Sequence, residues 1–257
     1  MFKKILIIFG LLVVCALFSG YFYCAERYTA RELQDVRCTG IDVVISNGRA
    51  QNFITEGEVA DMVRNRVIGK KMGDINTFDL EERLCSSSAI CKAEAYLQGP
   101  STLVLEVTQR LPVARFQRDG GGFFCDSSGY ILPLLGKVTL DLPVVSGKLP
   151  FSIPASGSGY PENGREWLRG MLSLTETIRN NSYWSREVEQ IWVEDNTDVV
   201  LYTCSCNEKF ILGSLNDIDV KLEKMAGYLR TIKPMAEKEN KHYTSVNLKY
   251  KDQIICK

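Results

Sequence analysis

The sequence predicts an α+β protein with an N-terminal transmembrane helix, a compact α+β unit, and then a mixed β-sheet domain with packed helices. Residues 5–25 carry no charge, segments of alternating hydrophobic residues recur along the rest of the chain, and amphipathic helical patterns lie between those segments. A length of 257 residues with 45% hydrophobic and 24% charged residues is typical of a globular protein.

The first element is the uncharged segment 5–25, which follows two lysines. A membrane-spanning helix needs about 20 apolar residues, so this segment is long enough to span. The lysines favour a cytoplasmic N-terminus, residues 1–4, and hence a single-pass type II protein with its C-terminal bulk in the periplasm. A cleaved signal peptide is the rival interpretation, but its apolar core would run only about 7–15 residues. The bulky residues that precede Cys15 and Cys24 disfavour a lipoprotein.

A juxtamembrane segment, residues 26–34, leads into a first unit over residues 35–110. Thr55 and Glu58 have capping-box spacing, which predicts the start of a helix at this point. The order of elements is strand, helix, helix, strand, strand, as in a compact α+β unit. The predicted strands lie within 35–46, 89–97 and 102–109, and the predicted helices within 55–69 and 77–86.

The second domain, residues 111–257, contains more strands than helices. The glycine run at 120–122 predicts a hairpin turn, and Pro234 is expected to stop the last long helix. The predicted strands are 113–117, 122–125, 130–132, 142–145, 188–194, 199–203, 209–212, 243–250 and 253–257, and the predicted helices are 165–181 and 217–233.

The composition points away from catalysis and from nucleic acid. Thirty-one basic residues balance 31 acidic ones, so no basic surface for nucleic acid is indicated. His242 is the only histidine, which excludes paired-histidine metal motifs, and no G-x-S-x-G elbow is present. We therefore predict no enzymatic activity, no catalytic residues, no cofactor and no metal.

Seven of the nine cysteines lie outside the predicted anchor, and most of them are expected to be small buried hydrophobes. Cys204 and Cys206 would share one face of a strand, where they could form half of a metal site or a redox pair, although a core or rim position is the favoured interpretation. The terminal strand offers a different possibility. At a sheet edge it would expose backbone groups to a partner strand, although it could equally just complete the sheet.

Several short segments resemble, in order, the motifs of one known family. They lie at residues 79–95, 107–115, 126–130, 142–147, 211–213 and 246–250. The segment 107–115 resembles a v-x-E-R-x-P-v-A signature, with Gln109 in place of glutamate. The chain thus resembles the FtsQ/DivIB family of bacterial cell-division proteins, whose first extracytoplasmic domain is a POTRA domain. Its cysteine-rich, short-tailed sequence is similar to that of Bacteroidetes-like members.

The resemblance implies a POTRA-like domain over residues 35–110 and a bitopic divisome scaffold of the cell inner membrane at the septum. It implies FtsB-like and FtsL-like partners, with other divisome members, in support of septal cell-wall synthesis. In the family, a partner segment adds a strand beside the final strands and the helix before them. By position, the implied partner-binding residues are Ser214, Leu248, Tyr250, Gln253, Ile254, Ile255 and Cys256.

Three departures from the family pattern affect charge contacts. Ser214, Asn247 and Lys249 stand where the family often has a basic residue, aspartate and arginine. Pairing through the main chain does not depend on them. The alternative functions are a membrane-anchored POTRA protein of outer-membrane assembly or secretion, which would carry repeated units or a barrel, and a periplasmic enzyme on an anchor, which would need a polar cluster.

Overall fold

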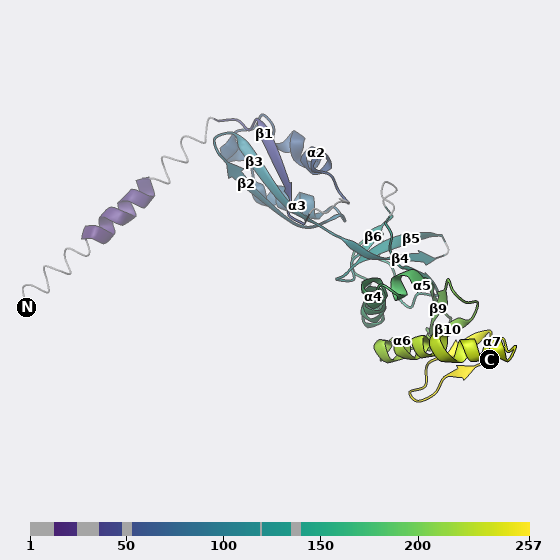
Figure 1. The fold of residues 1–257 in the computed structure, drawn as a ribbon. Helices are drawn as coiled ribbons and strands as arrows, with labels where there is room; N and C mark the ends of the chain where they lie inside the picture. The colour runs from purple at the N-terminus through teal and green to yellow at the C-terminus, as the bar shows by residue number, and fades with distance from the viewer. Residues whose placement is uncertain (1–12, 25–35, 48–52, 119, 135–139) are drawn as a thin grey trace, which may run out of the picture. The chain divides into compact units, whose positions relative to one another are not determined.

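The computed structural model describes residues 13–24, 36–47, 53–118, 120–134 and 140–257 (Figure 1). The chain divides into two compact units, Met1–Gln109 and Arg110–Lys257.

Residues 13–24 form a helix with exposed side chains and are the described part of the predicted anchor. Among the residues that the structure describes, no helix is both long enough and apolar enough to cross a membrane. The rest of the predicted anchor, the N-terminus at 1–4 and the juxtamembrane segment at 26–34 lie outside the described residues. The transmembrane span therefore stays a prediction.

The first unit has the predicted order of strand, helix, helix, strand and strand. Its three-stranded sheet has the order β1-β3-β2, with β1 parallel and β2 antiparallel to β3. The 3₁₀ turn η1 was not predicted from the sequence. The elements are β1 (Gly40–Ile45), α2 (Glu56–Val67), η1 (Met72–Asp74), α3 (Thr77–Cys85), β2 (Ile90–Gln98) and β3 (Thr102–Gln109).

The helix α2 begins as the capping box predicts. The Thr55 side chain accepts a hydrogen bond from the Glu58 backbone, and the Glu58 carboxylate accepts one from the Thr55 backbone. The strand β2 is irregular at its start. The register shifts between Ile90 and Lys92, and this bulge leaves Cys91 exposed while Ile90 is buried.

The second unit contains a mixed sheet of nine strands among the described residues. Their order is β12-β11-β10-β9-β8-β7-β4-β5-β6, and the pairs β4–β7, β7–β8 and β10–β11 are parallel. The strands are β4 (Pro112–Arg118), β5 (Gly121–Asp126), β6 (Ile131–Pro133), β7 (Val144–Gly147), β8 (Val188–Val193), β9 (Val199–Thr203), β10 (Lys209–Gly213), β11 (Ser245–Asn247) and β12 (Ile255–Cys256).

Helices α4 (Arg165–Asn180) and α6 (Ile218–Gly227) contribute to one core with this sheet, and a short helix α5 (Trp184–Glu187) follows α4. One face of α4 is buried, as Met171, Leu174 and Ile178 are at most 2% exposed. From the sheet, the rings of Phe116 and Phe123 stack in the same core with centroids 5.2 Å apart.

The last long helix does not stop at Pro234, contrary to the prediction. A π-helical turn, η2 (Tyr228–Ile232), follows α6, and α7 (Lys233–Lys238) then continues the helical path. Pro234 occupies the first turn of α7, where a missing N–H costs no helical hydrogen bond. The π-turn thus separates two helical segments, and the proline begins the second one.

The strand β7 ends at a glycine that no other residue could replace without strain. Gly147 has φ of 104°, and a Cβ added there would lie 2.2 Å from the Val193 carbonyl oxygen of β8. The backbone N–H of Lys148 donates to that same oxygen at 2.9 Å. The two strands therefore approach closely at this point of the sheet.

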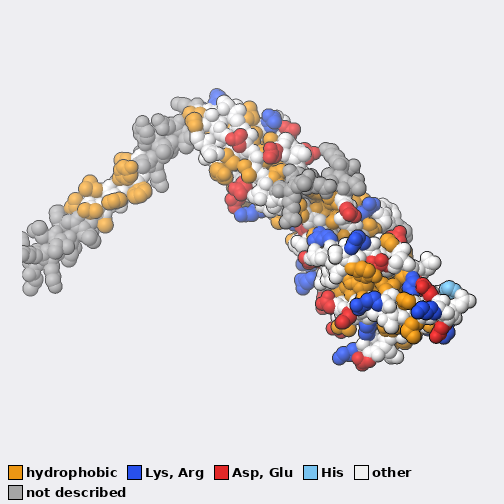
Figure 2. Space-filling model, viewed as in Figure 1, with side chains coloured by type: hydrophobic (Ala, Val, Ile, Leu, Met, Phe, Trp, Pro, Cys, Tyr) orange, Lys and Arg blue, Asp and Glu red, His pale blue; other side chains and the backbone are white. Residues whose placement is uncertain are grey.

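Acidic and basic side chains are intermixed over the visible face of each unit (Figure 2). This distribution agrees with the formal net charge of zero. No surface of a single sign is visible in this view, so recognition through local contacts fits this chain better than long-range attraction.

Candidate interaction site at the last strand

The last strand of the second unit lies at an edge of its sheet. β12 pairs with β11 on one side and is the first strand in the sheet order. β11 and β12 are shorter than the strands predicted at 243–250 and 253–257, because a turn occupies Lys251 and Asp252 and the chain is irregular around it. The edge is therefore a short strand, and its free side faces no other strand of the described residues.

The register of β12 determines which backbone groups face outward. Ser245 and Lys257 exchange two backbone hydrogen bonds of 3.0 and 3.1 Å. Residues of an antiparallel pair alternate in the direction of their N–H and C=O groups, so Ile255 also faces β11. The backbone groups of Ile254 and Cys256 consequently point to the open edge.

The predicted partner-binding residues divide into two groups. Tyr250 is 49% exposed, Gln253 and Ser214 are exposed, and Ile254, Ile255 and Cys256 are half-buried along the edge. Leu248 is different, since its side chain is fully buried in the core of the second unit. Leu248 can therefore support this surface from inside, but its side chain does not face outward.

Two lysines fasten the segment around Tyr250 to the rest of the unit, and a third binds Ser214. Lys224 of α6 donates to the Tyr250 carbonyl oxygen, and Lys249 pairs with Asp198. The buried Lys221 donates to the carbonyl oxygen of Ser214 at 2.7 Å, and its burial lowers its pKa. A lysine from α6 thus brings a cation to Ser214, where the family often has a basic side chain.

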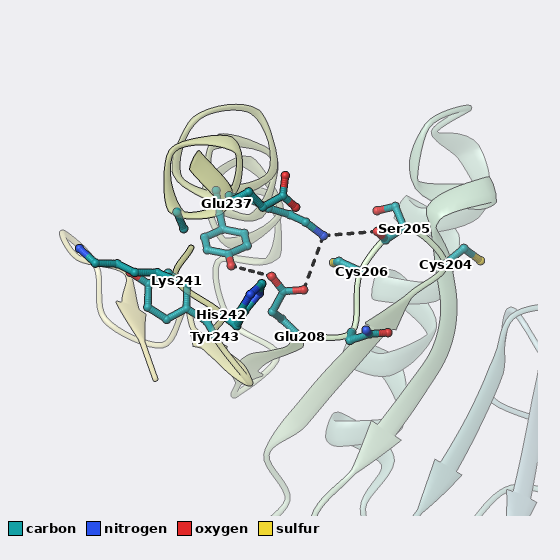
Figure 3. A pocket seen from close by; sticks show the side chains of 12 residues that line it. Cys204, Ser205, Cys206, Glu208, Glu237, Lys241, His242 and Tyr243 are labelled. Atoms are coloured by element: carbon teal, nitrogen blue, oxygen red, sulfur yellow. Dashed lines mark hydrogen bonds and ion pairs between the residues drawn. The ribbon is translucent and has the colours of Figure 1, made fainter. Parts of the chain in front are cut away.

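A polar pocket of about 280 Å³ lies where β11 begins and is lined by residues of the β9–β10 loop, Tyr228 and residues 233–243 (Figure 3). The Tyr228 hydroxyl donates to Glu208 Oε1 at 3.0 Å, and Lys233 Nζ lies 3.6 Å from Glu208 Oε2. Lys233 also donates to the Ser205 carbonyl oxygen at 3.3 Å. These contacts join the helical segment to the loop before β10, and satisfy the buried carboxylate.

The same contacts shift two pKa values in opposite directions. Burial raises the pKa of Glu208, but hydrogen bonds from its own backbone N–H and from Tyr228, with the charge of Lys233, outweigh burial and hold this pKa below its usual range. Burial and the hydrogen bond to Glu208 raise the pKa of the Tyr228 hydroxyl. At neutral pH the pair is therefore a carboxylate and a neutral phenol.

Acidification should remove the contribution of Glu208 to stability. A carboxyl with a lowered folded-state pKa stabilises the fold above its usual pKa of 4.5, and this stabilisation is lost as the pH falls through the folded-state value. We expect Glu208→Gln to lower the free energy of unfolding by about 1–2 kcal/mol at pH 7 and by much less at pH 3. Denaturant titrations at both pH values measure this difference, and an equal loss at both would contradict it.

The cysteines are less buried than predicted. Of the seven outside the predicted anchor, Cys38 and Cys125 are buried, Cys206 and Cys256 are partly buried, and Cys85, Cys91 and Cys204 are exposed. Burial, with the charge of Asp126, raises the pKa of the Cys125 thiol to about 12, so this thiol stays protonated at neutral pH.

Cys204 and Cys206 lie in the loop after β9 and not in a strand. Their side chains therefore do not share one face of a strand, contrary to the expectation. Cys206 faces Glu208, whereas the Cys204 side chain points away from Glu208 (Figure 3). No group of three or more potential ligands that could hold a metal occurs among the described residues. His242 also lines this pocket. Among the described residues, no hydrogen bond joins it to Ser205 or Cys206.

Comparison with known proteins agrees with this architecture. Residues 36–108 match a POTRA-like domain. Residues 111–257, more than half of the chain, match the family described as FtsQ/DivIB, C-terminal related. The chain belongs to the FtsQ/DivIB family. The cell division protein FtsQ of Geotalea daltonii is similar to this FtsQ/DivIB member, with 24% identity over 202 residues, 78% of this chain and 70% of the relative.

In this FtsQ/DivIB member, the motifs that carry the resemblance have structural roles. Gln109 is buried, and its side-chain oxygen accepts a hydrogen bond from the Phe53 backbone at 2.7 Å, at the position where the signature has glutamate. Asp126 Oδ1 accepts from the backbone of Ser128 and Tyr130, which closes the turn of the segment 126–130. The glycine of the segment 142–147 is Gly147, at the close approach of β7 and β8.

Sequence reasoning missed Lys221, Lys224, Glu208 and Tyr228 at this site. In the sequence, the two lysines are ordinary polar positions of an amphipathic helix. Tyr228 lies outside the apolar periodicity of the helix predicted at 217–233. Glu208 is a lone glutamate in a loop, where no sequence pattern indicates a role. The partners of these side chains lie on distant segments, so only the folded chain reveals their contacts.

Proposed function

We propose that the chain is a bitopic divisome scaffold that binds FtsB-like and FtsL-like partners and supports septal cell-wall synthesis. Membership of the FtsQ/DivIB family supports a role as a scaffold in cell division, without enzymatic activity. The observation that carries the binding mechanism is the position of β12, a sheet edge whose outward backbone groups are those of Ile254 and Cys256. A partner segment adds there as a further strand.

The surface around this edge supports the same proposal. The exposed ring of Tyr250 lies on the segment before β12, and Lys224 holds the carbonyl group of Tyr250 to α6. A partly exposed aromatic side chain on a fastened segment is a good anchor for a partner, because little conformational freedom is lost on binding. Pairing through the backbone supplies the affinity, and Tyr250 adds side-chain contact.

The proposed topology follows from the N-terminal sequence. Residues 5–25 anchor the chain in the inner membrane, residues 1–4 lie in the cytoplasm, and both folded units lie in the periplasm at the division septum. The family match over residues 111–257 favours this function over that of a POTRA protein of outer-membrane assembly or secretion.

The substitution Ile254→Pro tests strand addition. Proline removes the outward N–H at the open edge and leaves the pairs of Ile255 and Lys257 with β11 in place. We expect the affinity for the extracytoplasmic segment of an FtsB-type partner to fall at least about tenfold, measured by calorimetry with the full chain.

Ile254→Thr is the matched control, since it shortens the side chain but keeps the N–H. Its affinity should stay within about threefold of the parent affinity, because main-chain pairing is retained. An Ile254→Pro variant that is folded by thermal unfolding and still binds like the parent would exclude strand addition at this edge. Failure of the parent chain to bind any such segment would remove the scaffold proposal itself.

A further inference from the structure

A second pocket in the Arg110–Lys257 unit has a distinctly basic lining. It measures about 170 Å³ and lies between the turn that joins β5 to β6 and the first turns of α4. Its lining includes two arginines, Arg165 and Arg169, and no acidic residue. The arginines are four residues apart and therefore project from the same face of α4.

The other walls of the pocket are hydroxyl groups and apolar side chains. Ser128 Oγ and the Tyr160 hydroxyl lie 3.2 Å apart, and the Tyr160 ring is 45% exposed. Leu168 and Leu172 are buried and form the apolar part of the lining. A ligand with an apolar stem and an anionic head would match these walls.

One guanidinium group is already oriented for such a ligand. Arg165 Nε donates to the Pro161 carbonyl oxygen at 2.8 Å, and this hydrogen bond fixes the side chain. The two terminal nitrogens of the guanidinium group take no part in it. The guanidinium carbon also lies 5.8 Å from the centroid of the Tyr160 ring. A planar guanidinium held in this way binds a carboxylate through two parallel hydrogen bonds.

The backbone of the turn disfavours a phosphate ligand. Phosphate sites usually gather several free backbone N–H groups. Here the N–H groups of Ser128 and Tyr130 donate to the Asp126 carboxylate, and that of Gly129 donates to the Asp126 carbonyl oxygen. These donors are already used, so the pocket recognises an anion through its arginine side chains.

We propose that this pocket binds a glutamate or aspartate side chain of an acidic partner polypeptide. The site lies next to β6, at the opposite end of the sheet order from β12, so it is separate from the proposed strand addition. The neighbouring edge is itself covered, since Ile131 and Gly159 exchange two backbone hydrogen bonds. Docking at this end of the sheet therefore proceeds through side chains.

Calorimetry of the full chain with a short, acetylated and amidated peptide rich in glutamate and leucine tests the proposal. The matched peptide carries glutamine in place of every glutamate, and inorganic phosphate is the competing probe. We expect saturable binding of the glutamate peptide that weakens with added salt, and no saturable binding of the glutamine peptide. Arg169→Gln should weaken binding of the glutamate peptide about tenfold or more.

Arg179→Gln is the matched control, because it removes the same charge from the same helix outside this pocket. Its affinity for the glutamate peptide should equal that of the parent. The proposal is overturned if Arg169→Gln binds like the parent, if the glutamine peptide binds equally well, or if neither peptide binds. Displacement of the peptide by low millimolar phosphate would also overturn it, in favour of a phosphate site.

Discussion

Gly147→Ala should strongly destabilise the Arg110–Lys257 unit. The added Cβ would lie 2.2 Å from the Val193 carbonyl oxygen and 2.9 Å from the Val193 nitrogen, both in the backbone of β8. Backbone strain at a positive φ contributes about 1–2 kcal/mol, and displacement of the paired strand adds more. We expect a loss of roughly 3–5 kcal/mol, visible as a fall of about 10 °C or more in the Tm of this unit in calorimetry.

Gly157→Ala separates strain from crowding. Gly157 also has a positive φ, 76°, but no atom lies within 4 Å of its added Cβ. Its loss should be limited to about 1–2 kcal/mol, the strain contribution alone. Equal losses for the two variants would mean that the close approach of β7 and β8 has no energetic consequence.

Asp126→Ala is the second substitution with a large expected effect. Asp126 Oδ2 pairs with the Arg110 guanidinium at 2.9 Å, and both side chains are at most 12% exposed. Oδ1 holds the turn through Ser128 and Tyr130. Removal of one partner of a buried ion pair costs about 3–5 kcal/mol, because the Arg110 charge loses this buried counter-ion. Denaturant unfolding of the full chain measures this loss.

Asp126→Asn keeps the turn acceptor and loses only the charge, so its loss should be smaller. The double variant, with Arg110→Met and Asp126→Asn together, removes both charges of the pair. Its loss of unfolding free energy should be smaller than the sum of the losses of the two single variants. A double variant whose loss equals that sum would show that the ion pair contributes no coupling. The guanidinium of Arg110 also lies 3.6 Å from the Tyr130 ring centroid. The single variant Arg110→Met and the double variant both lose this contact, so it does not affect the comparison between them.

Local patterns predicted most of the elements correctly. Alternation located the strands of both units, and the capping box at Thr55 located the start of α2, because these signals depend on neighbours in the chain. The errors have nonlocal causes. The bulge that exposes Cys91 depends on pairing with β3, and the helical continuation past Pro234 depends on a π-turn that periodicity does not reveal.

The candidate site was predictable only in part. The resemblance placed it at the last strands, and the structure gives β12 an edge position. The sequence pattern does not show that Leu248 is buried and Tyr250 is exposed. Alternation along a strand would place both side chains on one face, but the strand ends at Asn247 and the chain is irregular after it. The fastening of this segment by Lys224 joins residues 26 positions apart in sequence, a distance at which no local pattern holds information.

The place of β12 in the sheet has a consequence for local stability. Among the described strands, β12 pairs only with β11, whereas β10 and β11 each have a neighbour on both sides. A two-residue strand with one neighbour opens at a lower free energy than the strands inside the sheet, because fewer hydrogen bonds must break. The edge proposed for docking can therefore open locally while the rest of the sheet stays folded.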